Sequence, residues 1–372
     1  MTTPTNRFDL PDIHTKPYVP YVKELPWLYH NTIYLCRHGS QAYGTNTPDS
    51  DLDLRGICVP PREYFLGYIH RFEQVVLKEP NDLTIFGLHK FAKLAADGNP
   101  NALEILFVDS RDILGMSGPG MRLLDNREWF LSKKIKHTMT GYAHSQLKRI
   151  QGHRAWLLNP PKSEPTRADF GLPERTVISA DQLATANSLI RKQVEAWQLS
   201  LDGVDDASRI EFEGRIAQTL TEMQMTSDQQ WSAAGRVIGM SENFLGILER
   251  ERAYTNARRN WEQYQQWKSE RNEKRAALEA KYGFDTKHGM HLIRLMESCA
   301  ETLETGILKV RRDNAKELLG IRNGSLSYDQ LMERADQLSK RVEAAYLTST
   351  LPREPQRTRI NELVMEITES ML

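Results

Sequence analysis

The chain has 372 residues, with 49 basic and 49 acidic side chains. It therefore has no net positive charge to draw it non-specifically onto nucleic acid or membranes, although a neutral chain can still contain a local basic groove. Its three cysteines stand far apart without a CxxC pair, which excludes a sequence-evident disulfide framework or cysteine zinc site. Since no segment has the apolar length of a signal peptide or a membrane span, we expect a soluble, cytoplasmic protein.

The N-terminal half begins with a Pro-rich arm and continues with a small α/β region. Residues 1–30 are irregular and are expected to lie over the first domain. Apolar runs typical of strands follow at 31–36, 51–59 and 72–78, with a fourth strand or a helix start at 81–88.

Helices dominate the rest of the chain. The segment LHKFAKLAADG has helical spacing and ends at Asp97-Gly98, and Asn99-Pro100 is typical of a cap followed by the first residue of a new helix. After Leu114 the strand pattern fades, and a loop with four prolines at 159–176 interrupts the helices. The pattern predicts an α+β chain, in which a small sheet domain precedes a larger all-α region.

Two carboxylates near the start of the second strand need an explanation. Asp51 and Asp53 share one face if both lie on a strand, and Arg55 follows on that face. Like charges at this spacing repel and do not favour folding. A Mg²⁺ ion removes the repulsion, because it is bound by one or two protein carboxylates together with substrate phosphates. The alternative is a solvated turn without a function.

The turn before these carboxylates suits a phosphate. Gly39 lets the backbone approach an anion closely, and the N–H groups after it, at the start of a short helix, attract negative charge. The Ser40 hydroxyl can add a hydrogen bond.

Together, HGSQAYG and PDSDLDLRGICVPP resemble the signature of the polymerase-β-like nucleotidyltransferase superfamily. The resemblance implies a mixed-sheet catalytic core at 31–115 and two bound Mg²⁺ ions, which Mn²⁺ can replace. It also implies a third carboxylate on a later strand, for which Asp82 is the best match. Asp82 then binds the acceptor-side ion, while Asp51 and Asp53 bind both ions; all three are the expected catalytic residues. The alternative role of Asp82 is a helix cap shared with Asn81.

A closer resemblance extends over residues 34–325. The RNA-repair-pathway polymerase-β-like family of bacteria and phages is similar to this chain in the blocks GSQAYGTNTPDSDLDLRGICVPP, HKFAKLAADGNPNALEILF, YAHSQLKRIQGHRAWLLNPP, PTRADFGLP, KHGMHLIRL and LETG. The resemblance implies a helical domain at 116–372, with a variable insertion near 179–241. It also implies a nucleoside triphosphate substrate and an RNA acceptor. In this family, Gly39, Ser40 and Arg55 are expected to bind the nucleotide.

Two helical stripes are further candidates for nucleotide binding. Tyr142 and Arg149 lie on one predicted helix face, which is either the wall of a nucleotide cleft or an ordinary amphipathic surface. Lys287, His291 and Arg294 form a basic stripe, which either clamps a triphosphate or RNA backbone or makes structural ion pairs.

The same stripe contains a pair of histidines. His288 and His291 have a spacing that permits metal binding. Because neither an acidic partner nor an HExxH pattern accompanies them, the sequence argues against a zinc site.

Three functions stay open at this point. The first is metal-dependent, template-independent transfer of a nucleoside monophosphate to an RNA 3′ end, with tRNA-like RNA as the natural acceptor and pyrophosphate released. The second is the same transfer to a protein side chain, which the neutral charge fits equally well. The third is a binding module without catalysis, against which the intact set of acids argues.

Overall fold

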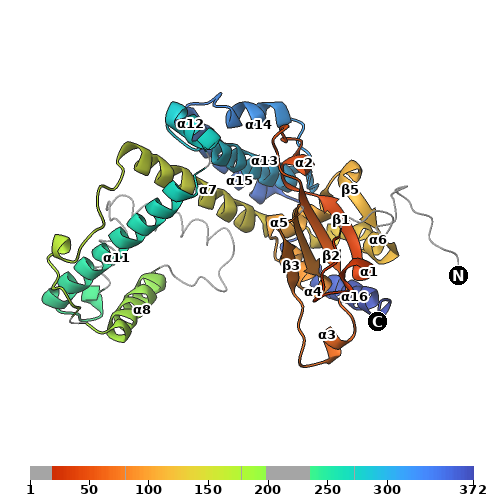
Figure 1. Ribbon diagram of the computed structural model, residues 1–372, viewed down its shortest axis with the longest axis horizontal. Coiled ribbons are helices and arrows are strands. Elements are labelled where there is room, and N and C mark those ends of the chain that lie inside the picture. The colour runs from red at the N-terminus through yellow and green to blue at the C-terminus, as the bar shows by residue number, and fades with distance from the viewer. Residues whose placement is uncertain (1–18, 80, 177, 198–234, 272) are drawn as a thin grey trace. The chain divides into compact units, whose positions relative to one another are not determined.

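The computed structural model describes residues 19–79, 81–176, 178–197, 235–271 and 273–372 (Figure 1). These residues form two compact units, one from Met1–Leu158 with Glu273–Leu372 and the other from Asn159–Asn272. The predicted α+β class is confirmed, since a small mixed sheet is followed by a larger helical region. None of the described helices combines the length and the apolarity needed to cross a bilayer. The predicted limits of the arm and the two domains stay predictions, and most of the expected insertion, 198–234, lies outside the described residues.

The sheet has five strands in the order β3-β4-β2-β1-β5. Their bounds are Thr32–Arg37 (β1), Asp53–Cys58 (β2), Gln74–Leu77 (β3), Asp82–Gly87 (β4) and Ile113–Met116 (β5). Strands β2 and β4 run parallel, whereas the other neighbouring pairs are antiparallel. The segment at 81–88 is thus a strand that leads directly into a helix. The edge strand β5 was not predicted, because its four residues are too few to show a period.

The unit that contains the sheet also contains most of the helices. Their bounds are Leu28–Asn31 (α1), Gly39–Tyr43 (α2), Glu63–Leu66 (α3), Leu88–Ala96 (α4), Pro100–Leu103 (α5), Gly118–Asp125 (α6), Ile135–Leu158 (α7), Glu273–Tyr282 (α12), Thr286–Thr305 (α13), Ala315–Arg322 (α14), Tyr328–Thr348 (α15) and Arg357–Glu369 (α16). As expected, α4 ends before Asp97, and Asn99 caps α5 by accepting a hydrogen bond from the Asn101 N–H at 3.0 Å.

Each face of the sheet has its own apolar core. Leu54 and Leu83 point to one face, where they pack with Val19 and Leu28 from the described part of the N-terminal arm. The opposite face is covered by helices far apart in the sequence, among them α4 and α16, which lie together in Figure 1. The helices after residue 116 therefore complete the core on which the sheet rests.

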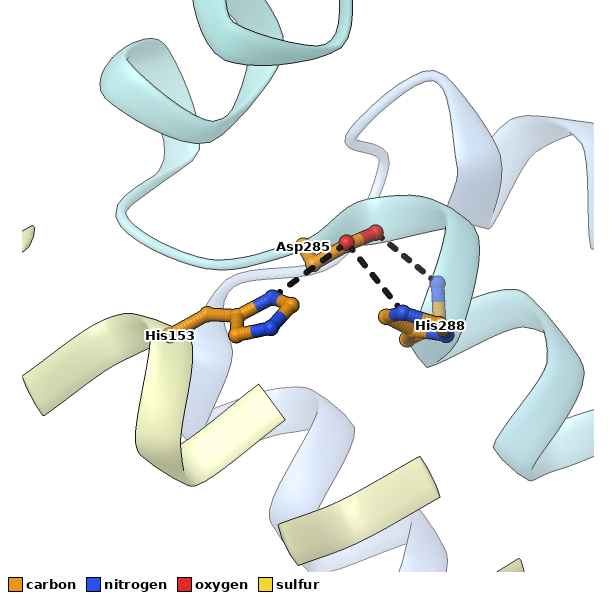
Figure 2. A group of neighbouring side chains, drawn as sticks. All are labelled: His153, Asp285 and His288. Carbon is orange, nitrogen blue, oxygen red and sulfur yellow. Dashed lines mark hydrogen bonds and ion pairs between the residues drawn. The ribbon is translucent and has the colours of Figure 1, made fainter. Parts of the chain in front are cut away.

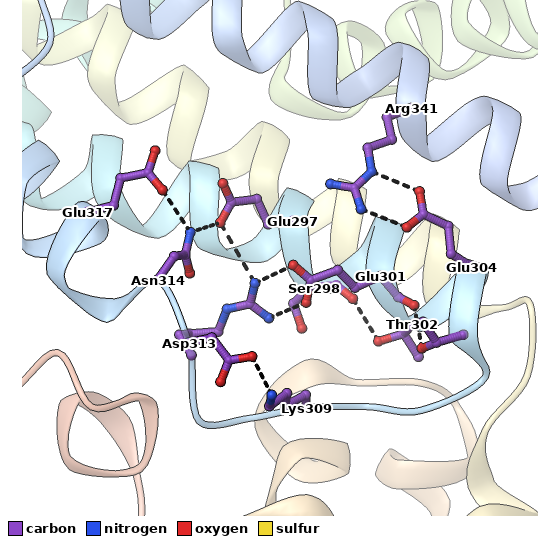
Figure 3. A network of polar contacts seen from close by, with 12 residues as sticks. Glu297, Ser298, Glu301, Thr302, Glu304, Lys309, Asp313, Asn314, Glu317 and Arg341 are labelled. Atoms are coloured by element: carbon purple, nitrogen blue, oxygen red, sulfur yellow. Dashed lines mark hydrogen bonds and ion pairs between the residues drawn. The ribbon is translucent and has the colours of Figure 1, made fainter.

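Helix α13 is the centre of the helical packing in this unit. It packs along α7 and α15 and also contacts α14, and most of its residues are buried. Its C-terminal half is fixed by ion pairs. Arg312 makes two bonds to Glu301. Arg341 makes two bonds to Glu304 (Figure 3). Because paired arginine–carboxylate contacts fix orientation as well as distance, α13 is a rigid support for whatever its N-terminal half carries.

The second unit has its own small core. Its described helices are Ala180–Trp197 (α8) and Glu242–Ser269 (α11). Ile190, Leu245 and Leu248 are buried between them, and Arg167 pairs with the buried carboxylate of Glu251.

Candidate functional site

Two of the predicted carboxylates meet where parallel strands begin. Asp53 is the first residue of β2 and Asp82 the first residue of β4, and the strand register places them directly opposite each other. Neighbouring strands lie about 4.8 Å apart, so both side chains border the same small volume. Asp82 does not cap the following helix, because the N-cap of α4 is Gly87. The competing explanation for Asp82 is therefore wrong.

Asp51 lies outside the strand on which it was expected. Strand β2 begins only at Asp53, and Asp51 is an exposed residue of the loop before it. The expectation that both acids occupy one strand is thus wrong, because the loop from Gly44 stays irregular up to residue 52. Asp51 still acts on Asp53 electrostatically.

Arg55 lies between the two strand starts. Its Nη1 atom is 3.4 Å from Asp82 Oδ1 and donates to the main-chain oxygen of Asp82 at 3.2 Å. The side chain of Arg55 is 20% exposed and that of Asp82 52% exposed. Arg55 therefore offsets part of the negative charge at this edge and stays within reach of a ligand there.

The environment of Asp53 disfavours its negative charge. Burial raises the pKa of Asp53 above its ordinary value, and the neighbouring Asp82 and Asp51 raise it further, while Arg55 and Lys287 act in the opposite direction. A half-buried carboxylate surrounded by two others gains most from a cation. The paired carboxylates of Asp53 and Asp82 offer the oxygen ligands that a hard divalent ion such as Mg²⁺ takes, with exposed Asp51 in the loop before β2. These two acids are compatible with the metal that the sequence predicted, and metal binding itself stays a prediction.

The Gly39-Ser40 turn lies directly against Asp53. Gly39 begins the five-residue helix α2 with a φ of 59°, and Gly44 ends this helix with a φ of 74°. A side-chain carbon on Gly39 would lie 2.2 Å from Asp53 Oδ2. The predicted order of strand, turn, short glycine-bounded helix and carboxylate strand is confirmed, and it brings Ser40 to the same place.

We expect Gly39→Ala to damage the site without unfolding the chain. The new methyl group requires a left-handed backbone that alanine rarely adopts and would displace the Asp53 carboxylate. Activity should fall at least about tenfold for a loss of about 1.4 kcal/mol of transition-state stabilisation. Steady-state transfer rates and far-UV circular dichroism check this, with Gly118→Ala as the control, since Gly118 has open space around it. Equal activity of the two variants would contradict the prediction.

A buried polar cluster around Glu104 holds the C-terminal end of α2. Tyr43, the last residue of α2, donates a hydrogen bond to Glu104 Oε2 at 2.6 Å, and Arg294 Nη1 donates to Glu104 Oε1 at 2.8 Å. The Arg294 guanidinium also lies 3.7 Å from the centre of the Tyr43 ring. His38, directly before the turn, has its Nε2 atom 3.8 Å from Glu104. The cluster therefore joins the turn to α13.

The cluster contains one negative charge, on Glu104, and one positive charge, on Arg294. Burial alone would raise the pKa of Glu104, but Arg294, His38 and Tyr43 hold it below its ordinary value. Burial lowers the pKa of His38 to about 4, more than Glu104 raises it, so His38 is neutral at pH 7. Glu104 and Arg294 are thus a buried ion pair that Tyr43 completes.

The loop between α13 and α14 also holds α2, through its main-chain oxygens. Arg311 pairs with Asp112 at 2.6 Å and donates to the Gln41 main-chain oxygen at 3.3 Å. The Arg312 N–H donates to the Tyr43 main-chain oxygen at 3.1 Å. Sequence reasoning missed this support because the partners are separated by about two hundred residues or more.

The basic stripe divides into three different environments. Lys287 is exposed and its charge reaches Asp53. Burial, followed by the neighbouring positive groups, lowers the pKa of His291 to about 3, so its ring is neutral at pH 7. Arg294 is only 6% exposed and is held by Glu104. Lys287 is therefore the member of this stripe that offers exposed positive charge near the carboxylates.

Tyr142 and Arg149, the two candidates on α7, have different surroundings from the basic stripe. The Tyr142 hydroxyl accepts a hydrogen bond from Asn99 at 3.1 Å, which ties α7 to α5. Arg149 is exposed on α7. Among the described residues, neither side chain has a recorded contact with the three carboxylates, so their role in nucleotide binding stays a prediction.

Comparison with known proteins gives three results. Residues 19–157 match the RNA repair pathway DNA polymerase beta family. An uncharacterized 38.9 kDa protein from the nrdC-mobD intergenic region of Enterobacteria phage T4 is 25% identical over 328 residues, which span 84% of this chain and 89% of that protein. No solved structure matches the chain significantly.

Proposed function

Residues 19–157 carry the RNA repair pathway DNA polymerase beta family match that the sequence motifs predicted, and on this premise we propose that the protein transfers a nucleoside monophosphate from a nucleoside triphosphate to an acceptor hydroxyl. The observation that carries the proposal is the register of Asp53 against Asp82, with Gly39 seated on Asp53. Two carboxylates beside a turn that can accept phosphate support the proposal, and Asp51 in the adjoining loop would be the third acid.

Each residue has a role that follows from its position. The main chain at Gly39 and the hydroxyl of Ser40 hold the outer phosphates, because glycine lets the backbone approach an anion closely. Lys287 and Arg55 add positive charge at the rim. Asp51, Asp53 and Asp82 would hold Mg²⁺. When bound, the metal neutralises charge on the carboxylates and phosphates.

Asp82 is the group placed to receive the acceptor's proton. It is the more exposed carboxylate of the strand pair and lies across from Asp53. A carboxylate within hydrogen-bond reach of an attacking hydroxyl acts as a general base. Arg55, 3.4 Å away, orients the side chain for this role.

We expect Asp82→Ala to separate chemistry from binding. The variant should keep triphosphate affinity within about threefold, because Asp51, Asp53 and the turn remain, but should lose at least about 100-fold in turnover. Isothermal titration with a non-hydrolysable triphosphate and single-turnover kinetics measure the two quantities. A variant with near wild-type turnover would contradict a catalytic role for Asp82. Glu79→Ala, on the exposed loop before β4, is the matched control.

The acceptor is proposed to be an RNA 3′ end, as the family description suggests. Incubation with all four α-labelled triphosphates, separately on total RNA and total protein, tests this. Label in RNA that Asp53→Asn abolishes supports the proposal. Label in protein would show that the side-chain acceptor is correct, and no label in either fraction would favour a binding module.

A further inference from the structure

A second group of potential metal ligands lies on α7 and at the start of α13. Nδ1 of His153 is 3.7 Å from Oδ2 of Asp285, and Nε2 of His288 is 3.6 Å from the same oxygen (Figure 2). One ligand atom from each of the three residues lies within 4.8 Å of the others. The expectation from the sequence that His288 has no acidic partner is wrong: Asp285, three residues earlier, and His153 lie beside it, whereas His291 is not part of the group.

The carboxylate of Asp285 is fixed before any ligand arrives. Asp285 is fully buried and caps α13, because its Oδ1 atom accepts the His288 N–H at 3.0 Å. This bond directs Oδ2 toward the two imidazoles, as Figure 2 shows. The turn before it is held by Arg154, whose Nη1 donates to the Gly283 main-chain oxygen at 2.8 Å.

The imidazoles are also held in position. His153 stacks on Trp156, with ring centres 5.5 Å apart and planes inclined by 24°. The His153 and His288 rings lie 5.8 Å apart, and both side chains are mostly buried, at 16% and 14% exposure. Each histidine therefore presents one nitrogen toward the carboxylate without a large change of position.

We propose that His153, Asp285 and His288 bind a Zn²⁺ ion that joins α7 to the N-terminus of α13. In tetrahedral coordination, zinc–nitrogen and zinc–oxygen bonds of about 2.0–2.2 Å place neighbouring ligand atoms roughly 3.3–3.6 Å apart. The two distances to Asp285 are at or just beyond that range and exceed the usual length of a hydrogen bond. Two imidazoles and one carboxylate match zinc chemistry, with water in the fourth position, and do not suit Mg²⁺.

The site gives the zinc a structural task. The helix that Asp285 caps carries Lys287, whose charge reaches Asp53, and Arg294, which supports α2. An ion that fixes the first turn of α13 against α7 thus stabilises the position of both. Zinc binding can be measured without any assay of nucleotide transfer, because none of the three ligands belongs to the carboxylate site.

Zinc binding is measured on the full chain after dialysis against chelator, by titration with Zn²⁺ in excess Mg²⁺, which occupies carboxylate sites but competes poorly for imidazole. We expect one tight Zn²⁺ site per chain and a higher melting temperature when it is filled. Replacing Zn²⁺ by Co²⁺ should give the visible absorption of a four-coordinate site containing nitrogen ligands.

Three variants decide the outcome. His153→Gln with His288→Gln should weaken Zn²⁺ binding at least about 100-fold, since two of three protein ligands are lost. Asp285→Asn keeps an oxygen to cap α13, so it should stay folded and lose the site. His144→Gln, an exposed histidine on α7, should bind as the wild type does. Absence of tight Zn²⁺ binding by the wild type, or wild-type binding by the double variant, would overturn the proposal.

Discussion

Asp53→Asn should abolish nucleotide transfer and leave the protein folded. The asparagine keeps the shape of the side chain beside Gly39 but removes the charge that a divalent cation requires. Because metal stabilisation of a phosphoryl transition state is worth several kcal/mol, we expect turnover to fall at least about 100-fold. Steady-state kinetics with Mg²⁺ and with Mn²⁺ measure the loss.

The stability of the same variant has a defined sign. In the folded protein the pKa of Asp53 is raised, so the ionised carboxylate destabilises the apo fold once the pH rises from the unfolded-state pKa through the folded-state pKa. At pH 7 the asparagine removes this penalty, and the variant should melt at the same temperature as the wild type or higher. Asp49→Asn, an exposed acid in the same loop, is the control for activity. Near wild-type turnover of Asp53→Asn would refute the metal assignment.

Of the substitutions considered, Glu104→Gln should lower the free energy of unfolding the most. It leaves the buried Arg294 guanidinium without a negative partner, and breaking a buried pair by removing one member costs about 3–5 kcal/mol. Urea unfolding followed by circular dichroism gives the change. Glu343→Gln removes an exposed ion pair with Lys136 and should cost at most about 1 kcal/mol.

A second substitution distinguishes the ion pair from simple packing. Adding Arg294→Met to Glu104→Gln replaces the unpaired charge with an apolar side chain of similar length, so part of the lost stability should return. If Glu104→Gln unfolds at the same urea concentration as Glu343→Gln, the cluster does not support α2 as described.

The parts of the fold with local patterns could be predicted from the sequence. The apolar run that forms β1 and the Asn99-Pro100 cap each depend on neighbouring residues, and both predictions were confirmed. The edge strand β5 could not be found, because its conformation depends on pairing with β1, about eighty residues earlier.

The candidate site was predictable in its acids but not in its supports. The motif identified Asp53 and Asp82 by type and position, yet their parallel register comes from the assembled sheet. The environment of Arg294 depends on Glu104, which is 190 residues away in the sequence. A spacing of four and three residues shows that side chains share a helix face, but not whether that face meets solvent or a buried acid.

The contact between His153 and Asp285 was not predicted from the sequence for the same reason. His153 lies on α7, so no fixed spacing in the sequence links it to Asp285. Asp285, by contrast, stands three residues before His288, and this local spacing was overlooked in favour of His291.

The most direct test of the carboxylate site is crystallography of the wild-type protein with Mn²⁺ and a non-hydrolysable nucleoside triphosphate. The proposed function predicts anomalous manganese density between Asp53 and Asp82, with Asp51 among the ligands and the outer phosphates against the Gly39-Ser40 turn. A bound triphosphate whose phosphates and manganese lie away from these carboxylates would contradict it.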